Sequence, residues 1–239
     1  MTRRRWIADE VSGDKAALVG DHADHLVRVL RARIGQEFDI STAAGVRRGR
    51  VTSLNNQRVE LELGEEVPGA ILLEITLLLS IFKFDPMEWA IEKCTELGVS
   101  HFVPVIARRT DSHLAVASAK RAERWRRIAL QASEQSRRPS PPEIADPVKL
   151  PAALNTTAGF RIVLAENERR TMLHDVVERA AVSSSIVLAI GPEGGWTDSE
   201  LQAFQKAGWI SASLGQTILR AETAAIAATA IAGAALTRL

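Results

Sequence analysis

The sequence predicts an α/β protein that is built on a parallel sheet and preceded by a small β-rich unit. Strand-like and helix-like segments alternate from residue 71 to the C-terminus, as in doubly wound parallel sheets. The run Ile186–Ile190 is apolar or small throughout, which suits a strand buried on both faces. The first 70 residues instead carry short strand patterns separated by glycines and asparagines, which favour hairpins.

Residues 1–69 are expected to form the β-rich domain. The elements predicted there are a short strand at residues 5–8, a helix at 21–30 and strands at 37–41, 46–54 and 59–63. Asn55-Asn56 provides the hairpin turn between the last two strands. Pro68 and Gly69 make residues 65–70 the best candidate for a linker.

Residues 70–239 are expected to form the α/β domain. The strands predicted there are residues 71–82, 101–107, 160–165, 186–190 and 210–214, and the helices are residues 86–97, 118–138, 171–181, a segment beginning near 198, and 223–236. The sequence Asp85-Pro86-Met87-Glu88 matches a capping box with proline at the first helical position. Thr197 and Glu200 match a second capping box.

Two glycine-containing loops follow predicted strands near the C-terminus. GPEGG occupies residues 191–195, and its glycines allow a sharp turn and a close approach of the backbone to a ligand. It lacks the spacing of a dinucleotide fingerprint and the Gly-Lys-Ser/Thr of a P-loop. Gly215 ends the second strand, and Arg220 and Glu222 lie at the start of the next helix. Because ligands of open α/β sheets bind at strand ends, both loops are candidates for a ligand site, with a plain tight turn as the alternative for the first.

The composition is that of an ordinary soluble globular protein, with 46% hydrophobic and 25% charged residues. Cys94 is the single cysteine, which excludes an intrachain disulfide and a cysteine-based metal site. His22 and His25 have i, i+3 spacing but no third ligand nearby, so no metal is expected. The last helix is too short and too rich in small residues to span a membrane. The basic N-terminus has no apolar stretch after it, so we expect no signal peptide and a cytoplasmic protein.

The net charge of +1 says little about partners, but the distribution of charge says more. Residues 101–140 hold nine Lys or Arg against three Asp or Glu, whereas residues 141–200 hold five against nine. Such a concentration of basic charge is typical of a protein that binds a polyanion. A solvated helix face explains it equally well.

GPEGG after a strand, followed by LGQTILRAETA at residues 214–224, resembles the C-terminal signature of the 16S ribosomal RNA (uracil-N3)-methyltransferase family, RsmE, in the SPOUT superfamily. Residues 25–35, 83–99 and 134–138 resemble further family stretches, with Pro86 at a position where a basic residue is expected. The resemblance implies a PUA-like β-barrel domain, then a SPOUT domain with a C-terminal trefoil knot that binds S-adenosyl-L-methionine. It also implies 16S rRNA of the small ribosomal subunit as the partner, and a homodimer.

The resemblance assigns site residues in three groups. Expected cofactor-binding residues are Leu164, Glu166, Ile190, Gly191, Pro192, Gly194, Gly195, Leu214, Gly215, Ile218, Leu219, Thr223 and Ala224. Expected catalytic residues are Arg220, which stabilises the uracil oxyanion or orients the base, and Glu222, which accepts the N3 proton or fixes Arg220. Expected RNA-binding residues are Arg4, Arg5, Arg28, Arg31, Arg33, Lys83, Arg109, Gln135, Ser136 and Arg138.

Two other functions stay open at this point. The protein could be a SPOUT methyltransferase acting on tRNA or on a ribose 2′-hydroxyl, although the PUA-like unit and the EQSRR stretch at residues 134–138 favour the small-subunit enzyme. It could also be an RNA-binding protein without catalysis, against which the intact GPEGG and LRAETA sequences weigh. For a dimer surface, the sequence suggests the small-residue last helix together with Trp196 and Trp209.

Overall fold

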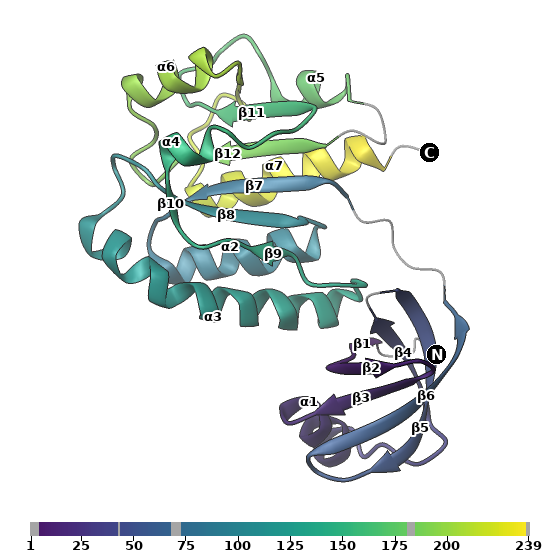
Figure 1. Ribbon diagram of the computed structural model, residues 1–239. Helices are drawn as coiled ribbons and strands as arrows, with labels where there is room; N and C mark the ends of the chain where they lie inside the picture. The colour runs from purple at the N-terminus through teal and green to yellow at the C-terminus, as the bar shows by residue number, and fades with distance from the viewer. Residues whose placement is uncertain (1–4, 43, 68–72, 181–184, 238–239) are drawn as a thin grey trace. The chain divides into compact units, whose positions relative to one another are not determined.

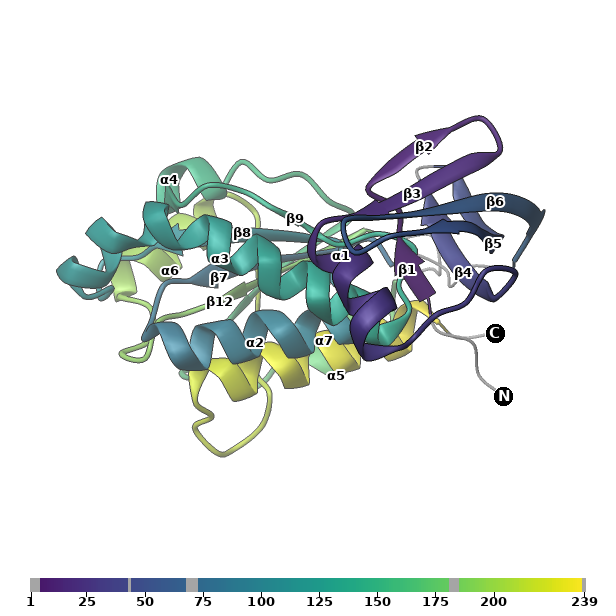
Figure 2. The ribbon, with the colours of Figure 1, turned by 90° about the horizontal axis from the view of Figure 1, so that it is seen from below.

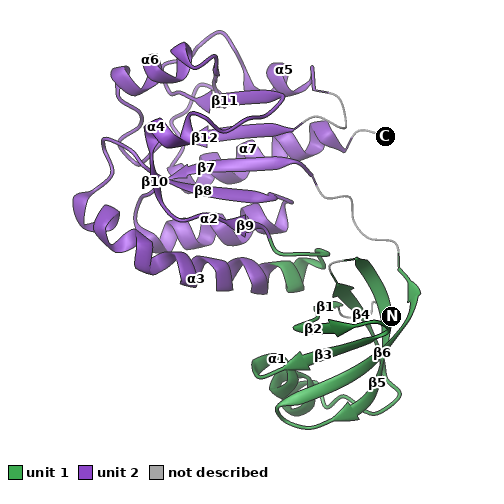
Figure 3. Ribbon diagram, in the orientation of Figure 1, with its two compact units in different colours: residues 1–71, 133–141 green, residues 72–132, 142–239 purple. Residues whose placement is uncertain are grey.

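The structure is a computed structural model that describes residues 5–42, 44–67, 73–180 and 185–237. The chain divides into two compact units (Figure 3): a first unit of residues 1–71 and 133–141, and a second unit of residues 72–132 and 142–239. The first unit therefore includes a segment from the middle of the chain.

The first unit is a curled six-stranded sheet with a short helical segment (Figure 1). Its elements are β1 (Arg5–Ile7), β2 (Glu10–Ser12), β3 (Lys15–Val19), α1 (Asp21–Asp24), the π-helical turn η1 (His25–Val29), β4 (Glu37–Thr42), β5 (Gly45–Leu54) and β6 (Arg58–Glu66). The strand order is β1-β4-β5-β6-β3-β2, in which only β1 and β4 pair in parallel. The expected small barrel-like domain is confirmed, as a mixed sheet.

Two features of this sheet differ from the prediction. The β2–β3 hairpin was not expected; its turn contains Gly13 at φ +59°, a left-handed conformation that favours glycine. Strand β6 runs to Glu66, beyond the predicted end at residue 63, because Glu66 pairs with Arg47 of β5. The predicted linker at residues 65–70 is therefore strand at its beginning, and its last three residues lie outside the described part of the chain.

The second unit is a parallel sheet covered by helices on both faces. Its elements are β7 (Ile75–Ser80), α2 (Phe84–Glu96), β8 (His101–Ile106), α3 (Ser112–Ser136), β9 (Glu143–Ile144), β10 (Val148–Lys149), α4 (Leu150–Ala153), β11 (Phe160–Leu164), α5 (Leu173–Val177), β12 (Ile186–Ile190), α6 (Asp198–Lys206), β13 (Ile210–Ala212) and α7 (Ala221–Leu236). The order is β10-β8-β7-β12-β11-β13, with β9 beside β8. The expected α/β class is confirmed, and the knot stays a prediction.

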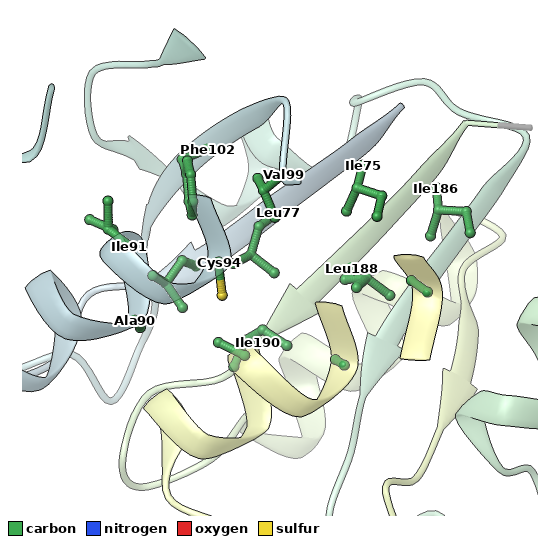
Figure 4. Packing of buried hydrophobic residues seen from close by; sticks show 14 of the residues in the cluster. Ile75, Leu77, Ala90, Ile91, Cys94, Val99, Phe102, Ile186, Leu188 and Ile190 are labelled. Atoms are coloured by element: carbon green, nitrogen blue, oxygen red, sulfur yellow. The ribbon is translucent and has the colours of Figure 1, made fainter. Parts of the chain in front are cut away.

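The fully apolar strand β12 shows how the two faces are used. Ile186, Leu188 and Ile190 point to one core, which α2, α3, α5 and α7 cover (Figure 4). Val187 and Ala189 point to the opposite core, which α4 and α6 cover. Because both sides of the strand are buried, every residue is apolar. Helices α2 and α7 lie side by side on the first face (Figure 2).

The predicted capping box of α2 and the predicted start of α3 were wrong. Helix α2 begins at Phe84, and its N-cap residue Lys83 makes no side-chain cap bond. The predicted capping box fails because Glu88 is buried and accepts hydrogen bonds from Arg121 and Arg124 of α3. Helix α3 begins at Ser112, six residues before the predicted start at Ser118, whose hydroxyl donates to the carbonyl of Ala115 within the helix.

Other predicted boundaries hold more closely. The capping box of α6 is confirmed, since Thr197 accepts the N–H of Glu200 and the Glu200 carboxylate accepts the N–H of Thr197. Trp125 and Ala129 are buried on one face of α3, as expected. Helix α5 is shorter than predicted and ends at Val177, and α7 begins at Ala221, two residues early. Within the described ranges, no helix is long and apolar enough to cross a membrane.

Candidate functional site

A cavity of about 720 Å³ lies at the carboxyl ends of the strands in the second unit. Three chain segments supply most of its wall: residues 164–169 after β11, residues 190–196 after β12 and residues 212–222 after β13. Lys83 and Arg109, which follow β7 and β8, also line this cavity. This is the edge of a parallel sheet where ligands bind, and the volume is that of a small-molecule site.

The GPEGG loop is held in a tight conformation. The N–H of Gly195 donates to the carbonyl of Pro192 at 2.8 Å, and Gly195 has φ +69°. A Cβ on Gly195 would lie 3.7 Å from the carboxylate of Glu166, and one on Gly191 would lie 3.2 Å from the indole nitrogen of Trp196. Glycine thus gives the turn its backbone angle and keeps the cavity wall free of side chains.

The loop after β13 is fixed at its base. The Ser213 hydroxyl accepts the N–H of Gly215 and donates to the carbonyl of the same residue, at 3.2 and 3.0 Å. Backbone bonds join Ser213 to Thr171 and Leu173, which precede and begin α5. Gly215 has φ +133° with no atom near its missing Cβ, so the turn itself requires glycine there.

Arg220 and Glu222 both line the cavity at the start of α7. Arg220 is the N-cap residue and is exposed, whereas Glu222 in the first turn is only 9% exposed. The carboxylate of Glu222 forms no hydrogen bond or ion pair with another residue in the described part of the chain. The positive end of the helix dipole favours a carboxylate at this position. The site therefore holds one nearly buried carboxylate and one exposed guanidinium, two residues apart at the start of α7.

The structure brings almost all the predicted cofactor residues together. The cavity is lined by Leu164, Glu166, Ile190, Gly191, Pro192, Gly194, Gly195, Leu214, Gly215, Ile218, Leu219 and Ala224. Thr223 is exposed on α7 and lies outside the cavity, because successive residues of a helix point in different directions. Lys83 also lines the cavity, with its ammonium 3.8 Å from the carboxylate of Glu193.

Apart from Lys83 and Arg109, which line the cavity, the predicted RNA-binding residues belong to the first unit. Arg28 pairs with Asp24 at 2.7 Å, whereas Arg31 and Arg33 have no ion pair among the described residues. Arg5 donates to the carbonyl of Arg137, and burial lowers its pKa. The remaining predicted positions are Gln135 and Ser136 at the end of α3, Arg138, which is buried with a pKa lowered by that burial to about 10, and Arg4, which lies outside the described residues.

Sequence reasoning missed several residues of the cavity wall. Asn167, Arg169, Trp196, Asp198 and Gln216 all line it. Asn167 and Arg169 could have been predicted, because they lie within four residues of the end of the predicted strand at 160–165. Residues just after a parallel strand lie at the edge of the sheet where ligands bind. Trp196 gave no such signal, because an indole after a glycine turn is equally suited to the core.

The suggested role of Trp196 and Trp209 in a dimer surface was wrong. Both indoles are buried, at 7% and 5% exposure, and each packs edge-to-face on Phe204 with ring centres 4.9 and 5.0 Å apart. They fill the core under α6 because aromatic rings bury large apolar areas. Helix α7 is likewise buried along most of its length within its own unit.

Comparisons with known proteins agree with this geometry. Residues 70–233 match the family model described as RNA methyltransferase domain. A ribosomal RNA small subunit methyltransferase E from Synechocystis is 34% identical over 84% of this chain and 66% of that protein, and one from Aquifex aeolicus is 31% identical over 95% of this chain and 97% of that protein. This chain thus spans about two thirds of the Synechocystis protein.

A solved structure is similar over nearly the whole chain. It is the crystal structure of a ribosomal RNA small subunit methyltransferase E from Neisseria gonorrhoeae bound to S-adenosyl methionine, with a TM-score of 0.84 and 32% identity over 96% of both chains. The family expected from the two loop sequences is thereby confirmed. With its glycine-walled cavity at the ends of a parallel sheet, this chain belongs to the RNA methyltransferase family that includes the ribosomal RNA small subunit methyltransferases E.

Proposed function

We propose that this protein transfers the methyl group of S-adenosyl-L-methionine to N3 of a uridine in 16S rRNA of the small ribosomal subunit. The observation that carries the proposal is the single cavity wall formed by the GPEGG loop, the loop after β13 and the nearly buried carboxylate of Glu222. The Neisseria relative was crystallised with this cofactor, and the relatives are named for small-subunit ribosomal RNA.

The cavity fits such a cofactor in size and in chemistry. Its volume of about 720 Å³ holds a molecule as large as an adenosyl amino acid. Ile190, Gly191, Gly194, Leu214 and Leu219 line the cavity along the two loops, and their backbone together with Leu164 would hold the cofactor. The bound cofactor supplies a methyl carbon that its sulfonium already activates, so the protein chiefly aligns the two reactants.

Arg220 and Glu222 are proposed to act on the uracil. N3 of uracil carries a proton at neutral pH, so a group in the site has to remove that proton or stabilise the anion that its loss leaves. The exposed guanidinium of Arg220 can neutralise negative charge on the uracil oxygens. The Glu222 carboxylate can accept the N3 proton or fix Arg220, and its lack of a partner among the described residues keeps it available for either role.

The first unit is proposed to hold the RNA through basic side chains. Arg31 and Arg33 follow η1, and Ile34 beside them is 70% exposed, so this segment projects from its unit. Guanidinium groups without carboxylate partners are suited to phosphate contacts. Arg4, Arg5, Arg28, Gln135, Ser136 and Arg138 of the same unit, and Lys83 and Arg109 at the cavity, complete the proposed RNA-binding set. A ribosomal substrate also implies a cytoplasmic location.

A homodimer is proposed as the working form. The proposal follows from the family resemblance, and the exposed side chains of Trp89 and Ile218, at 48% and 76%, are candidates for the contact. Sedimentation equilibrium measures the assembly directly, and a monomer at micromolar concentration would contradict it.

The test of function uses small-subunit RNA and intact small subunits with methyl-labelled cofactor. After digestion to nucleosides, mass spectrometry against standards should find the label in N3-methyluridine. Label in a 2′-O-methyl nucleoside, or only when tRNA is supplied, would reject the uridine N3 assignment in favour of another RNA methyltransferase. A protein that binds RNA but releases or absorbs no heat when titrated with S-adenosyl-L-methionine would instead be a non-catalytic RNA-binding protein.

A further inference from the structure

The turn after β8 is bonded to two neighbouring elements of the second unit, the end of β7 and the start of α6. The hydroxyl of Thr110 donates to the carbonyl of Ile81 after β7 at 3.2 Å and accepts the N–H of Ala107 at 3.1 Å. The N–H of Arg108 donates to the carboxylate of Glu200 at the start of α6 at 2.8 Å. These bonds between side chains and main chain hold the backbone of the turn, and with it the base of the Arg109 side chain, in place.

Arg109 reaches from this turn to the GPEGG loop. Its Nη1 donates to the carbonyl of Gly194 and lies 3.5 Å from the carbonyl of Trp196. Its aliphatic stem covers Gly194, since a Cβ on that glycine would lie 3.3 Å from the Cδ of Arg109. One guanidinium thus binds carbonyls on both sides of Gly195, the residue at φ +69°.

We propose that Arg109 is a positioning residue that fixes the shape of the cofactor loop at residues 191–196. Charge-assisted hydrogen bonds to two carbonyls define both the distance and the direction of the loop relative to β8. Both contacts come from one nitrogen, Nη1, which the rigid guanidinium plane holds between the two carbonyls. No carboxylate is paired with Arg109 in the described part of the chain, so its charge serves the loop carbonyls.

This role explains the local sequence. A Cβ on Gly194 would lie 3.3 Å from the Cδ of Arg109, so a larger residue there would require the arginine stem to shift. Arg108, the neighbouring arginine, donates its backbone N–H to Glu200, and its side chain is exposed to solvent. The chain consequently offers a matched control, because Arg108→Ala removes the same kind of side chain from the same turn and keeps the bond to Glu200.

The direct test is hydrogen–deuterium exchange of the cofactor-free protein. In Arg109→Ala, amides of residues 191–197 should exchange at least about tenfold faster than in the parent protein, the change expected from losing one charge-assisted bond. Arg108→Ala should leave those amides unchanged, and Arg109→Lys should lie between. Unchanged exchange in a folded Arg109→Ala protein would overturn the proposal, and if that variant does not fold, unchanged exchange in Arg109→Lys would do so.

Kinetics give a second measurement, which rests on the proposed function. Arg109→Ala should raise the KM for S-adenosyl-L-methionine about tenfold and leave the KM for RNA within about twofold. An increase confined to the KM for RNA would assign Arg109 to RNA binding instead. If the parent protein transfers no methyl group but exchange in residues 191–197 depends on Arg109, the proposed function fails and the positioning role stands.

Discussion

His22 Nε2 lies 3.0 Å from Oε1 of Glu134, so an imidazole of α1 meets a carboxylate near the end of α3 within the first unit. Its Nδ1 lies 2.9 Å from Oδ2 of Asp9. The hydrogen bond to Glu134 and that to Asp9 together outweigh the opposing effect of burial and raise the pKa of His22 to about 9. The ring is therefore charged at neutral pH, and it fastens residues 133–141 to the sheet.

This ion pair predicts a pH dependence of stability. The pKa of His22 is higher in the folded protein than the ordinary value near 6.5, so its contribution is complete below about pH 6.5 and is lost as pH rises through 9. His22→Gln should lower the free energy of unfolding by about 1–3 kcal/mol at pH 6.5 and by much less at pH 10. Urea denaturation followed by circular dichroism at both pH values measures this, and an equal loss at both would exclude the charged form.

The bond between Arg108 and Glu200 predicts a second stability effect. Glu200 is 5% exposed. Its two carboxylate oxygens accept the backbone N–H groups of Arg108 and Thr197 and the hydroxyl of Thr197. Glu200→Ala leaves partly buried N–H donors without an acceptor and should cost about 1–3 kcal/mol. Gln202 is exposed on the same helix, so Gln202→Ala should change stability by less than about 0.5 kcal/mol. Equal urea midpoints for the two variants would contradict the role of this carboxylate.

Arg220 and Glu222 predict a loss of turnover with the cofactor still bound. Arg220→Ala and Glu222→Gln should each lower the rate of methyl transfer by about 10²–10⁴-fold, while calorimetric titration shows cofactor affinity within about threefold of the parent. If Glu222 acts only by fixing Arg220, the double variant should be no slower than Arg220→Ala. Normal turnover in either single variant removes that residue from the mechanism.

Alanine variants of Gly195 and Gly208 distinguish the cost of backbone strain from an effect on cofactor binding. Both have positive φ, +69° and +77°, and Gly208 follows α6, outside the cavity wall. Alanine at either position should cost roughly 1–2 kcal/mol of stability through left-handed strain. Only Gly195→Ala should also weaken cofactor binding, by about tenfold, because its Cβ enters the cavity beside Glu166. Unchanged affinity in Gly195→Ala would show that this glycine serves the turn alone.

Cys94 should be unreactive in the folded protein. It is fully buried against α7, where the Thr229 hydroxyl lies 3.5 Å from its sulfur, and burial raises the pKa of the thiol to about 12. Since the thiolate is the reactive form, iodoacetamide at pH 8 should label the chain only in urea. Mass spectrometry of the intact protein detects the label, and rapid modification under native conditions would show that α2 and α7 separate easily.

Local chemistry explains which parts of the fold the sequence predicted well. The apolar run of β12 and the capping box of α6 are each contained in a few consecutive residues, so neighbours in the sequence settle them. The two glycine loops could be placed at one sheet edge because carboxyl ends of parallel strands meet there. The knot is a property of the path of the whole chain, and it stays a prediction of the family resemblance.

Competing partners explain where prediction failed. Glu88 has the spacing of a capping residue, but two arginines from α3 are stronger partners for a buried carboxylate than a helix N-terminus. Trp196 and Trp209 were suggested as a surface, yet Phe204 offers them a buried aromatic contact. In both cases the deciding group lies elsewhere in the chain, and the local pattern does not include it.

The sequence by itself determined the α/β class, the two glycine turns and the family, since these depend on short runs of residue types. Tertiary structure alone decided that Glu222 is nearly buried without a partner among the described residues, that Arg109 holds the carbonyls beside Gly195, and that residues 133–141 join the first unit. The physical reason is that burial and pairing are set by atoms brought together from distant positions, whereas turns and strand periods are set by adjacent ones.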